Sequence, residues 1–344
     1  MSLKIAIAHH DGAARSILQQ TLAREADYQV IWTTGHGVDA LRKCRRDTPD
    51  ILLVDLALAD IDGAQFICDV MKETPCAILV LSDAIHLQAG KVFEAMGCGA
   101  LDAIATPVRK ADGLMEGEDA LLKKMATMAK LLGKAIQPSR PAGRAVPARP
   151  DHLPPLIAIG SSTGGPKALA TILAALPHDL GAAIIICQHV DIQFAQGLAQ
   201  WLNTQTPLAV DIVREGMRPE AGVTLVAGTN DHLVLGQDRA FHYTPHPRDY
   251  PYRPSVNTFF ESILKYWPRK DLAILLTGMG RDGGEGLSAL RKAGWHTIVQ
   301  DEKTSVVYGM PAAAVELGGA VEILPLEMIA PAILKKIKLS KGMS

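Results

Sequence analysis

The feature that most constrains the fold of this sequence is an alternation of short apolar runs with segments of helical length. In the first half, runs of about five to seven residues are rich in Ile, Leu and Val and read as buried strands. They are KIAIA, QVIWTT, DILLVDL, AILVLSD and ALDAIATP. The second half repeats the pattern. An alternation of strands and helices predicts an α/β fold with a doubly wound parallel sheet in each half.

Between the two halves, residues 108–155 break this pattern. The segment EGEDALLKKMATMAKLLGKAI (116–136) has charged and apolar faces and predicts a helix. The following QPSRPAGRAVPARPDHLPP is rich in proline, small residues and arginine, which is typical of an extended, semi-rigid linker. We therefore expect a first domain at 1–107, a helix and linker at 108–155, and a second domain at 156–340.

The charge balance and hydropathy exclude two classes of partner. Lys plus Arg total 35 and Asp plus Glu total 36, so the basic excess that nucleic-acid binding needs is missing. No apolar run reaches the roughly 18 residues of a membrane-spanning helix. The apolar stretch at the N-terminus is too short for a signal peptide, so we expect no membrane insertion and a cytoplasmic location.

The cysteines support the same location. Five are scattered along the chain without a CxxC pair: Cys44, Cys68, Cys76, Cys98 and Cys187. An odd number without close pairs predicts neither a disulfide framework nor a zinc site, and it fits a reducing compartment.

The first half resembles a response-regulator receiver domain. The resemblance rests on DILLVDLALADIDG (50–63), LVLSD (79–83) and GCGALDAIATP (97–107). It implies a flavodoxin-like, five-stranded parallel sheet. It also implies that Asp55, at the end of the third strand, accepts a phosphoryl group and that Ser82 is the switch residue.

Two departures make this receiver degenerate. His9 and His10 occupy the places of the acidic pair that binds Mg²⁺ in the family, and Thr106 replaces a lysine. Mg²⁺ prefers carboxylate oxygen, although Asp11 together with Asp55 could still hold it. Transition-metal binding by the two histidines is the weaker alternative, because adjacent side chains in a loop are expected to point in different directions. Both a phosphorylated receiver and a docking module without phosphorylation therefore stay open.

In the second half, the stretch LIAIGSSTGGPKAL (156–169) passes from a predicted strand through a turn into a predicted helix. It fits neither a Walker-type phosphate loop nor a dinucleotide fingerprint. It does contain Gly-x-Ser-x-Gly, with Ser162 at the position of the nucleophile in a nucleophile elbow. The alternative is an ordinary turn in which a serine caps the helix.

A nucleophilic serine needs a base and an acid that orients the base, and two further strand ends supply candidates for both. The run AAIIICQHV ends at His189, and LAILLTGMGRDGGEGL leads into a glycine-rich turn that contains Asp282. Parallel strands deliver their carboxyl ends to one edge of a sheet, so Ser162, His189 and Asp282 are expected there together. Such a hydrolase needs neither a metal nor an organic cofactor for catalysis.

The second half also resembles the CheB family of chemotaxis-type protein-glutamate methylesterases, and with the receiver the resemblance covers nearly the whole chain. It rests on GSSTGG, CQHV, YRPSVNTFF, LTGMGRDGGEGL and QDEKTSVVYGMPAAAVELG. It implies that Ser162 is the nucleophile, His189 the general base and Asp282 its orienting acid, with Thr163 and Met279 shaping the oxyanion site. It further implies a methyl-accepting chemoreceptor as substrate, with hydrolysis of glutamate methyl esters and deamidation of glutamines, and a chemosensory histidine kinase as partner.

Three interpretations follow from these resemblances. The chain is a methylesterase regulated by its receiver, a methylesterase whose receiver only docks, or a non-catalytic signalling adaptor. The degenerate receiver is also similar to those of methylesterases in alternative, Wsp-type chemosensory systems. If the receiver inhibits the esterase, a fragment starting near residue 152 is expected to be more active than the full chain.

Overall fold

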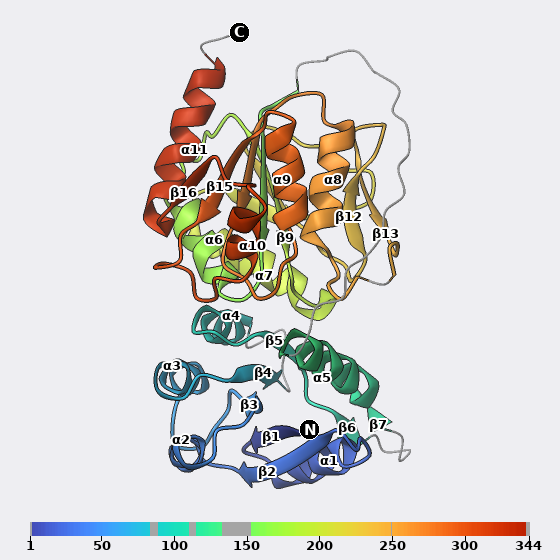
Figure 1. Cartoon of the computed structure of the whole chain (residues 1–344), viewed down its shortest axis with the longest axis vertical. Helices are drawn as coiled ribbons and strands as arrows, with labels where there is room; N and C mark the ends of the chain where they lie inside the picture. Colours follow the sequence, from blue (N-terminus) through green and yellow to red (C-terminus); the bar gives the residue numbers. More distant parts are fainter. Residues whose placement is uncertain (1, 83–88, 110–114, 133–152, 249, 342–344) are drawn as a thin grey trace. The chain divides into compact units, whose positions relative to one another are not determined.

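The computed structural model describes residues 2–82, 89–109, 115–132, 153–248 and 250–341 (Figure 1). The chain separates into two compact units, Met1–Gln137 and Pro138–Ser344. We call them the N-terminal and C-terminal units and describe each by itself. Most of the predicted linker, residues 137–152, lies outside the described residues. Within the described ranges we find no helix with the length and apolar character that crossing a membrane requires.

The N-terminal unit is built on a five-stranded sheet with strand order β2-β1-β3-β4-β5, in which all pairs are parallel. The strands are β1 (Leu3–Ala8), β2 (Tyr28–Thr34), β3 (Ile51–Asp55), β4 (Ala77–Ser82) and β5 (Asp102–Ala105). The predicted runs thus form the predicted strands, and the order is that of flavodoxin-like folds. β3 and β4 are buried along their whole length, which explains their continuous apolar sequences.

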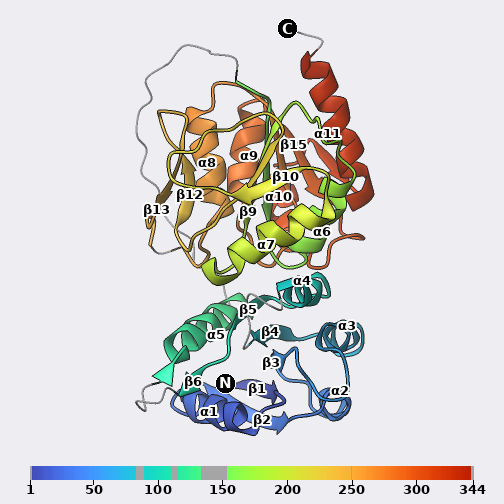
Figure 2. The ribbon, with the colours of Figure 1, turned by 180° about the vertical axis from the view of Figure 1, so that it is seen from behind.

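Helices cover both faces of this sheet. They are α1 (Gly12–Leu22), α2 (Gly37–Arg46), α3 (Gly63–Glu73), α4 (Ala89–Gly97) and α5 (Glu118–Leu132). Figures 1 and 2 show α1 and α5 on one face and α2, α3 and α4 on the other. A short hairpin of β6 (Val108–Arg109) and β7 (Met115–Glu116) precedes α5.

Helix α5, which the sequence places in the 108–155 region, packs into the core of the N-terminal unit. Its buried side chains Leu121, Met125 and Met128 belong to the same apolar cluster as residues of β1, β3 and β4. Glu118, at its start, accepts hydrogen bonds from the Thr21 hydroxyl at 2.6 Å and from Arg24 at 2.9 Å. The packed unit therefore extends beyond residue 107.

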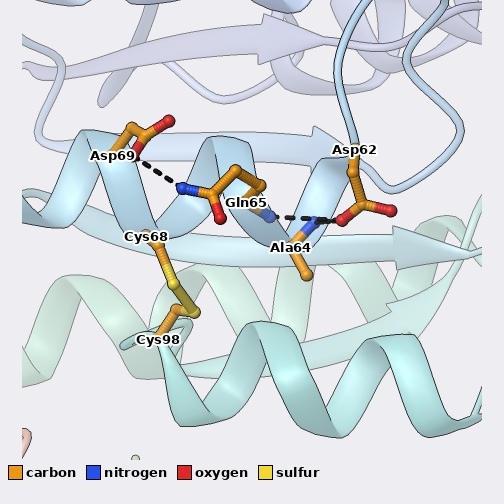
Figure 3. The surroundings of a disulfide bond; sticks show 6 residues. All are labelled: Asp62, Ala64, Gln65, Cys68, Asp69 and Cys98. Atoms are coloured by element: carbon orange, nitrogen blue, oxygen red, sulfur yellow. Dashed lines mark hydrogen bonds between the residues drawn. A yellow bond between two sulfur atoms is a disulfide. The ribbon is translucent and has the colours of Figure 1, made fainter.

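One disulfide corrects the expectation from the cysteine pattern, so the cysteines no longer support a reducing compartment. Cys68, on α3, and Cys98, directly after α4, are joined with their Cα atoms 4.8 Å apart (Figure 3). They are 30 residues apart in the chain. Spacing rules compare cysteines that are close in sequence, whereas here the packing of α3 against α4 brings a distant pair together. The other three cysteines are free thiols.

The C-terminal unit is built on a seven-stranded parallel sheet of order β10-β11-β9-β8-β14-β15-β16. The strands are β8 (Leu156–Ser161), β9 (Ala183–Gln188), β10 (Ala209–Ile212), β11 (Val223–Val226), β14 (Leu272–Leu275), β15 (His296–Gln300) and β16 (Glu322–Leu324). The first strand, β8, has β9 on one side and β14 on the other. The strand order reverses there, which is the position where doubly wound sheets place their functional sites.

Helices again lie on both faces of this sheet. They are α6 (Gly165–Ala174), α7 (Ile192–Gln205), α8 (Val256–Tyr266), α9 (Gly284–Lys292), α10 (Met310–Glu316) and α11 (Leu326–Lys341). Figures 1 and 2 show α8 and α9 on one face and α6, α7 and α11 on the other. An antiparallel hairpin of β12 (His232–Leu235) and β13 (Phe241–Thr244) packs beside α8. Both units thus have the doubly wound α/β fold that the sequence predicts.

Candidate active site

The first component of the site is the turn between β8 and α6, which presents Ser162. Gly164 adopts a left-handed conformation with φ of +78°, and a Cβ atom there would lie 2.6 Å from the Cβ of Val306. Only glycine fits this combination of backbone angle and space. Pro166 then stands in the first turn of α6, where its missing N–H costs no hydrogen bond. The strand–turn–helix context of a nucleophile elbow is therefore present.

Buried side chains fix the backbone of this turn. The Gln188 carboxamide accepts from the Ser161 hydroxyl at 2.6 Å and donates to the carbonyl oxygens of Ser162 and His189, at 2.9 and 3.0 Å. From the other side, the amide of Ser162 donates to the carbonyl oxygen of Thr277 at 3.0 Å. Gln188 therefore ties the β8 and β9 ends together. The only sign of this role in the sequence is a glutamine at the end of an otherwise apolar strand.

The second component is a hydrogen-bonded pair formed by His189 and Asp282. His189 follows β9, and Asp282 lies in the turn between β14 and α9. His189 Nε2 is 2.8 Å from Asp282 Oδ2. A carboxylate only accepts hydrogen bonds, so Nε2 carries the proton and the neutral ring has its lone pair on Nδ1. That Nδ1 atom is buried and has no hydrogen-bond partner among the described residues.

The Asp282 carboxylate is held by the N-terminus of α8. It accepts from the Ser255 hydroxyl at 2.9 Å and from the backbone amides of Val256 and Asn257 at 2.6 and 3.0 Å. Burial raises the pKa of Asp282, but the bonds from His189 and these amides outweigh it and leave the pKa below its ordinary value. Asp282 is therefore a buried anion in a site built for negative charge.

Two aromatic rings support this pair: His232, which no sequence pattern marks, and Tyr252, which begins the YRPSVNTFF motif. His232 is fully buried, accepts from the Ser255 amide at 3.1 Å and approaches the Pro247 carbonyl oxygen at 2.9 Å. It thus fixes the start of α8. Tyr252 stacks on the ring of His189, with centroids 4.5 Å apart and planes inclined by 8°. The segment around Tyr252 and Ser255 therefore positions the His–Asp pair.

Thr163 and Met279 lie in the two turns that flank Ser162. The Thr163 carbonyl oxygen accepts from the Thr277 hydroxyl at 2.9 Å, and the Gly278 carbonyl oxygen accepts from the Met310 amide at 2.8 Å. Among the described residues, the amides of Thr163 and Met279 donate to no protein acceptor. The oxyanion role of these two residues therefore stays a prediction.

The structure joins His189 to Asp282 and places Ser162 at the same edge of the sheet. Ser162 and His189 follow neighbouring strands, and the His189 amide donates to the Ser161 carbonyl oxygen at 3.0 Å. No hydrogen bond joins the Ser162 hydroxyl to the His189 ring in the described part of the chain. Such bonds are often long before substrate binds and shorten in the reacting complex.

In the N-terminal unit, Asp55 and Ser82 end neighbouring strands and are both buried. Thr106 follows β5, and its amide lies 3.4 Å from the Ser82 carbonyl oxygen. The hydroxyls of Ser82 and Thr106 are buried and have no hydrogen-bond partner among the described residues. The residues singled out in the receiver therefore gather at the carboxyl edge of its sheet.

The two histidines after β1 correct the expectation that their side chains diverge. Their rings stack, with centroids 5.2 Å apart, and both face Asp55. His10 Nδ1 forms a short hydrogen bond with Asp55 Oδ2, and His9 Nδ1 lies 3.8 Å from the same oxygen. The expectation failed because the backbone of this loop turns both rings toward the same carboxylate.

This donor set does not fit Mg²⁺, the ion that the receiver fold implies. The described cluster offers two imidazoles and one carboxylate, whereas Mg²⁺ is bound through oxygen. Asp11, the alternative carboxylate, instead caps α1 by accepting from the amides of Ala13 and Ala14 at 3.1 Å. We therefore derive no Mg²⁺-dependent step for this unit.

Fold and site together define a class: α/β proteins that combine a receiver-like unit with a hydrolase-like unit carrying a serine elbow and a buried His–Asp pair. The family model described as CheB methylesterase matches residues 157–333, and that of the response regulator receiver domain matches residues 5–116. The chain belongs to the CheB methylesterase family.

Two relatives are similar in sequence to this chain along nearly its whole length. A protein of Cupriavidus metallidurans named protein-glutamate methylesterase/protein-glutamine glutaminase 2 is 46% identical, over 96% of this chain and 97% of its own. One of Burkholderia lata named protein-glutamate methylesterase/protein-glutamine glutaminase 1 is 48% identical, over 95% and 97%. The crystal structure of the Thermotoga maritima CheB methylesterase catalytic domain is 32% identical and covers 54% of this chain and 98% of its own, with a TM-score of 0.51.

Proposed function

We propose that this chain hydrolyses γ-methyl esters of glutamate residues on a methyl-accepting chemoreceptor, with Ser162 as nucleophile. The observation that carries the proposal is the state of the His189 ring. Its Nε2 atom donates to the buried Asp282 at 2.8 Å, and its Nδ1 atom is buried without a hydrogen-bond partner among the described residues. A base with an available lone pair thus stands one strand away from the serine of the elbow.

The proposed reaction has two halves. Ser162 Oγ attacks the ester carbonyl carbon while His189 Nδ1 takes the hydroxyl proton, and Asp282 stabilises the resulting imidazolium. The backbone amides of Thr163 and Met279 donate to the oxyanion. The imidazolium then protonates the leaving oxygen and methanol departs from the acyl-enzyme. A water molecule, activated by the same base, releases the glutamate carboxylate and restores Ser162. Every proton is carried by a group of this chain, so the proposal needs no metal or organic cofactor.

The same site would accept a glutamine side chain. The carboxamide has the same carbonyl carbon, and protonation by His189 would release ammonia in place of methanol. An amide is the harder substrate, because nitrogen is the poorer leaving group. We propose deamidation as a second, slower activity, and the names of the two relatives support it.

For the N-terminal unit we propose a docking role toward a chemosensory histidine kinase or the receptor, in the cytoplasm. The unit has the receiver fold and a buried Asp55, but its donor set does not match Mg²⁺. This mismatch favours docking over Mg²⁺-dependent phosphorylation. Incubation of the chain with acetyl phosphate and Mg²⁺ should therefore leave Asp55 unmodified, as intact mass would show.

The experiment that tests the esterase is methanol release from a methylated chemoreceptor. The wild-type chain should release methanol and Ser162→Ala should not. The control variant Thr171→Ala should keep the activity, because it removes an exposed hydroxyl of α6 that bonds the Lys167 carbonyl oxygen. Equal release by the wild type and Ser162→Ala would overturn the assignment of the nucleophile. Receptor binding without methanol release from any variant would support the non-catalytic adaptor instead.

A further inference from the structure

We propose that His9, His10 and Asp55 form a binding site for a divalent transition-metal ion of the Zn²⁺ or Co²⁺ type. They are the one group of three histidine, cysteine or acidic residues in the described residues whose ligand atoms could share an ion. The site lies in the N-terminal unit, and the proposal is independent of the esterase chemistry.

The spacing of the donor atoms suits an ion of this size. The candidate ligand atoms of the three residues all lie within 4.8 Å of one another, and His9 Nδ1 is 3.8 Å from Asp55 Oδ2. Ligands at 2.0–2.1 Å around a tetrahedral Zn²⁺ are roughly 3.3 Å apart. A small rotation of the rings would bring them to that spacing. Three protein ligands with one position left to water is a common zinc arrangement.

The chemistry of the donors selects the kind of ion. Imidazole nitrogen suits Zn²⁺, Co²⁺ and Ni²⁺, and it does not suit Mg²⁺ or Ca²⁺. The single carboxylate balances part of the ionic charge in a place where both His9 and Asp55 are buried. Two acidic residues at these positions would offer oxygen ligands, which Mg²⁺ and Ca²⁺ prefer. Two histidines offer nitrogen ligands, which Zn²⁺ and Co²⁺ accept.

The surrounding structure holds the ligands in place. Arg15 donates to the carbonyl oxygens of His9 and His10 at 2.5 and 3.0 Å, which fixes the backbone of the loop. The Asp11 amide donates to His9 Nδ1 at 3.1 Å, so this nitrogen is unprotonated. The Ala57 amide donates to the other Asp55 oxygen at 2.9 Å and orients the carboxylate. Such support around the ligands is typical of metal sites.

Binding would replace existing hydrogen bonds rather than fill an unused space. The ion takes the place of the proton between His10 Nδ1 and Asp55 Oδ2, and His9 Nδ1 exchanges the Asp11 amide for the ion. The His10 ring stays neutral, because it gives up the Nδ1 proton and takes one at Nε2 from solvent, which reaches this ring because its side chain is 43% exposed.

The test uses untagged, metal-free full-length chain titrated with Co²⁺ and followed by visible absorption. We expect a single Co²⁺ per chain with the absorption of a low-coordinate site, displaced by Zn²⁺ and unaffected by a large excess of Mg²⁺. His10→Ala and Asp55→Asn should each weaken binding by at least about tenfold. His10 is half-exposed, so its replacement should leave the fold intact, which circular dichroism checks.

Two control variants make the result specific. His36→Ala removes an exposed histidine of the same unit, and His242→Ala removes one that contacts Glu215 and Asp238 in the other unit. Both should bind Co²⁺ as the wild type does. No Co²⁺ band in the wild type, or equal affinity in the wild type, His10→Ala and Asp55→Asn, would overturn the proposal. Displacement of Co²⁺ by Mg²⁺ at comparable concentration would do the same.

Discussion

His189 Nε2 lies 2.8 Å from Asp282 Oδ2, and the same carboxylate oxygen accepts from the Val256 amide at 2.6 Å. The N-terminus of α8 therefore holds the Asp282 carboxylate in place. Through this carboxylate it also fixes the tautomer of the neutral His189 ring. An element far from the serine in sequence thus sets the direction in which the His189 lone pair points.

Replacing Asp282 by asparagine should lower kcat for methanol release by about 10³–10⁴-fold, because the amide no longer enforces the Nε2–H tautomer. A matched control is Asp271→Asn. Asp271 is also buried and accepts from the Leu156 amide and the Trp267 indole, but it stands before β14, at the opposite end from the site. We expect Asp271→Asn to reduce stability and to leave kcat largely intact. Equal kcat losses in both variants would argue against an orienting role for Asp282.

Tyr252 should contribute to activity through its ring and not through its hydroxyl. Burial raises the pKa of Tyr252, so the hydroxyl stays neutral at physiological pH. Tyr252→Phe keeps the stack on His189 and should retain near wild-type kcat. Tyr252→Ala loses the stack and should lower kcat roughly three- to tenfold, as expected for one aromatic pair. If the Phe variant is as impaired as the Ala variant, the hydroxyl matters and the stacking account is wrong.

His232 should make the stability of the C-terminal unit depend on pH. Burial lowers the pKa of His232, so the folded state prefers the neutral ring that accepts from the Ser255 amide. The unfolded chain takes up the proton first. The stabilisation is therefore complete above about pH 6.5 and is lost as the pH falls toward the lower folded pKa.

Urea unfolding at pH 8 and pH 5.5, compared between wild type and His232→Asn, isolates this contribution. The asparagine carboxamide can still accept from the Ser255 amide and does not titrate. The wild type should lose more unfolding free energy between the two pH values than the variant does. The same loss in both would show that His232 is not the titrating group.

The Cys68–Cys98 disulfide should stabilise the packing of α3 on α4. Closing a loop of 30 residues restricts the unfolded chain by about 3–4 kcal/mol in the chain-entropy treatment. Cys98→Ser, or reductant added to the wild type, should speed hydrogen exchange in these two helices. Cys76→Ser, which removes a free thiol, should not. Unchanged exchange in Cys98→Ser under oxidising conditions would contradict this prediction.

Much of the fold and the strand ends of the site could be predicted from the sequence. Strands buried on both faces have continuous apolar sequences, so β8, β9 and β14 were visible as runs. Because parallel strands deliver their carboxyl ends to one edge, the positions of Ser162, His189 and Asp282 followed from topology alone.

The features that the sequence did not predict share one physical cause. Each depends on tertiary contacts between residues that are far apart in the chain. The His9 and His10 rings both face Asp55, which lies 45 residues beyond His10 in the chain. Helix packing pairs Cys68 with Cys98. The α8 terminus that holds Asp282 approaches it from 27 residues away, at Ser255. No local pattern in the sequence contains such distances.

The most direct test of the central claim is a double-mutant comparison of methanol release by Ser162→Ala, His189→Gln and the variant with both changes. Residues that act as one nucleophile–base unit lose nearly all activity with the first substitution, so the double variant should be no slower than either single one. If the two losses multiply instead, Ser162 and His189 act independently, and the hydrolysis proposed here does not proceed through a serine activated by this histidine.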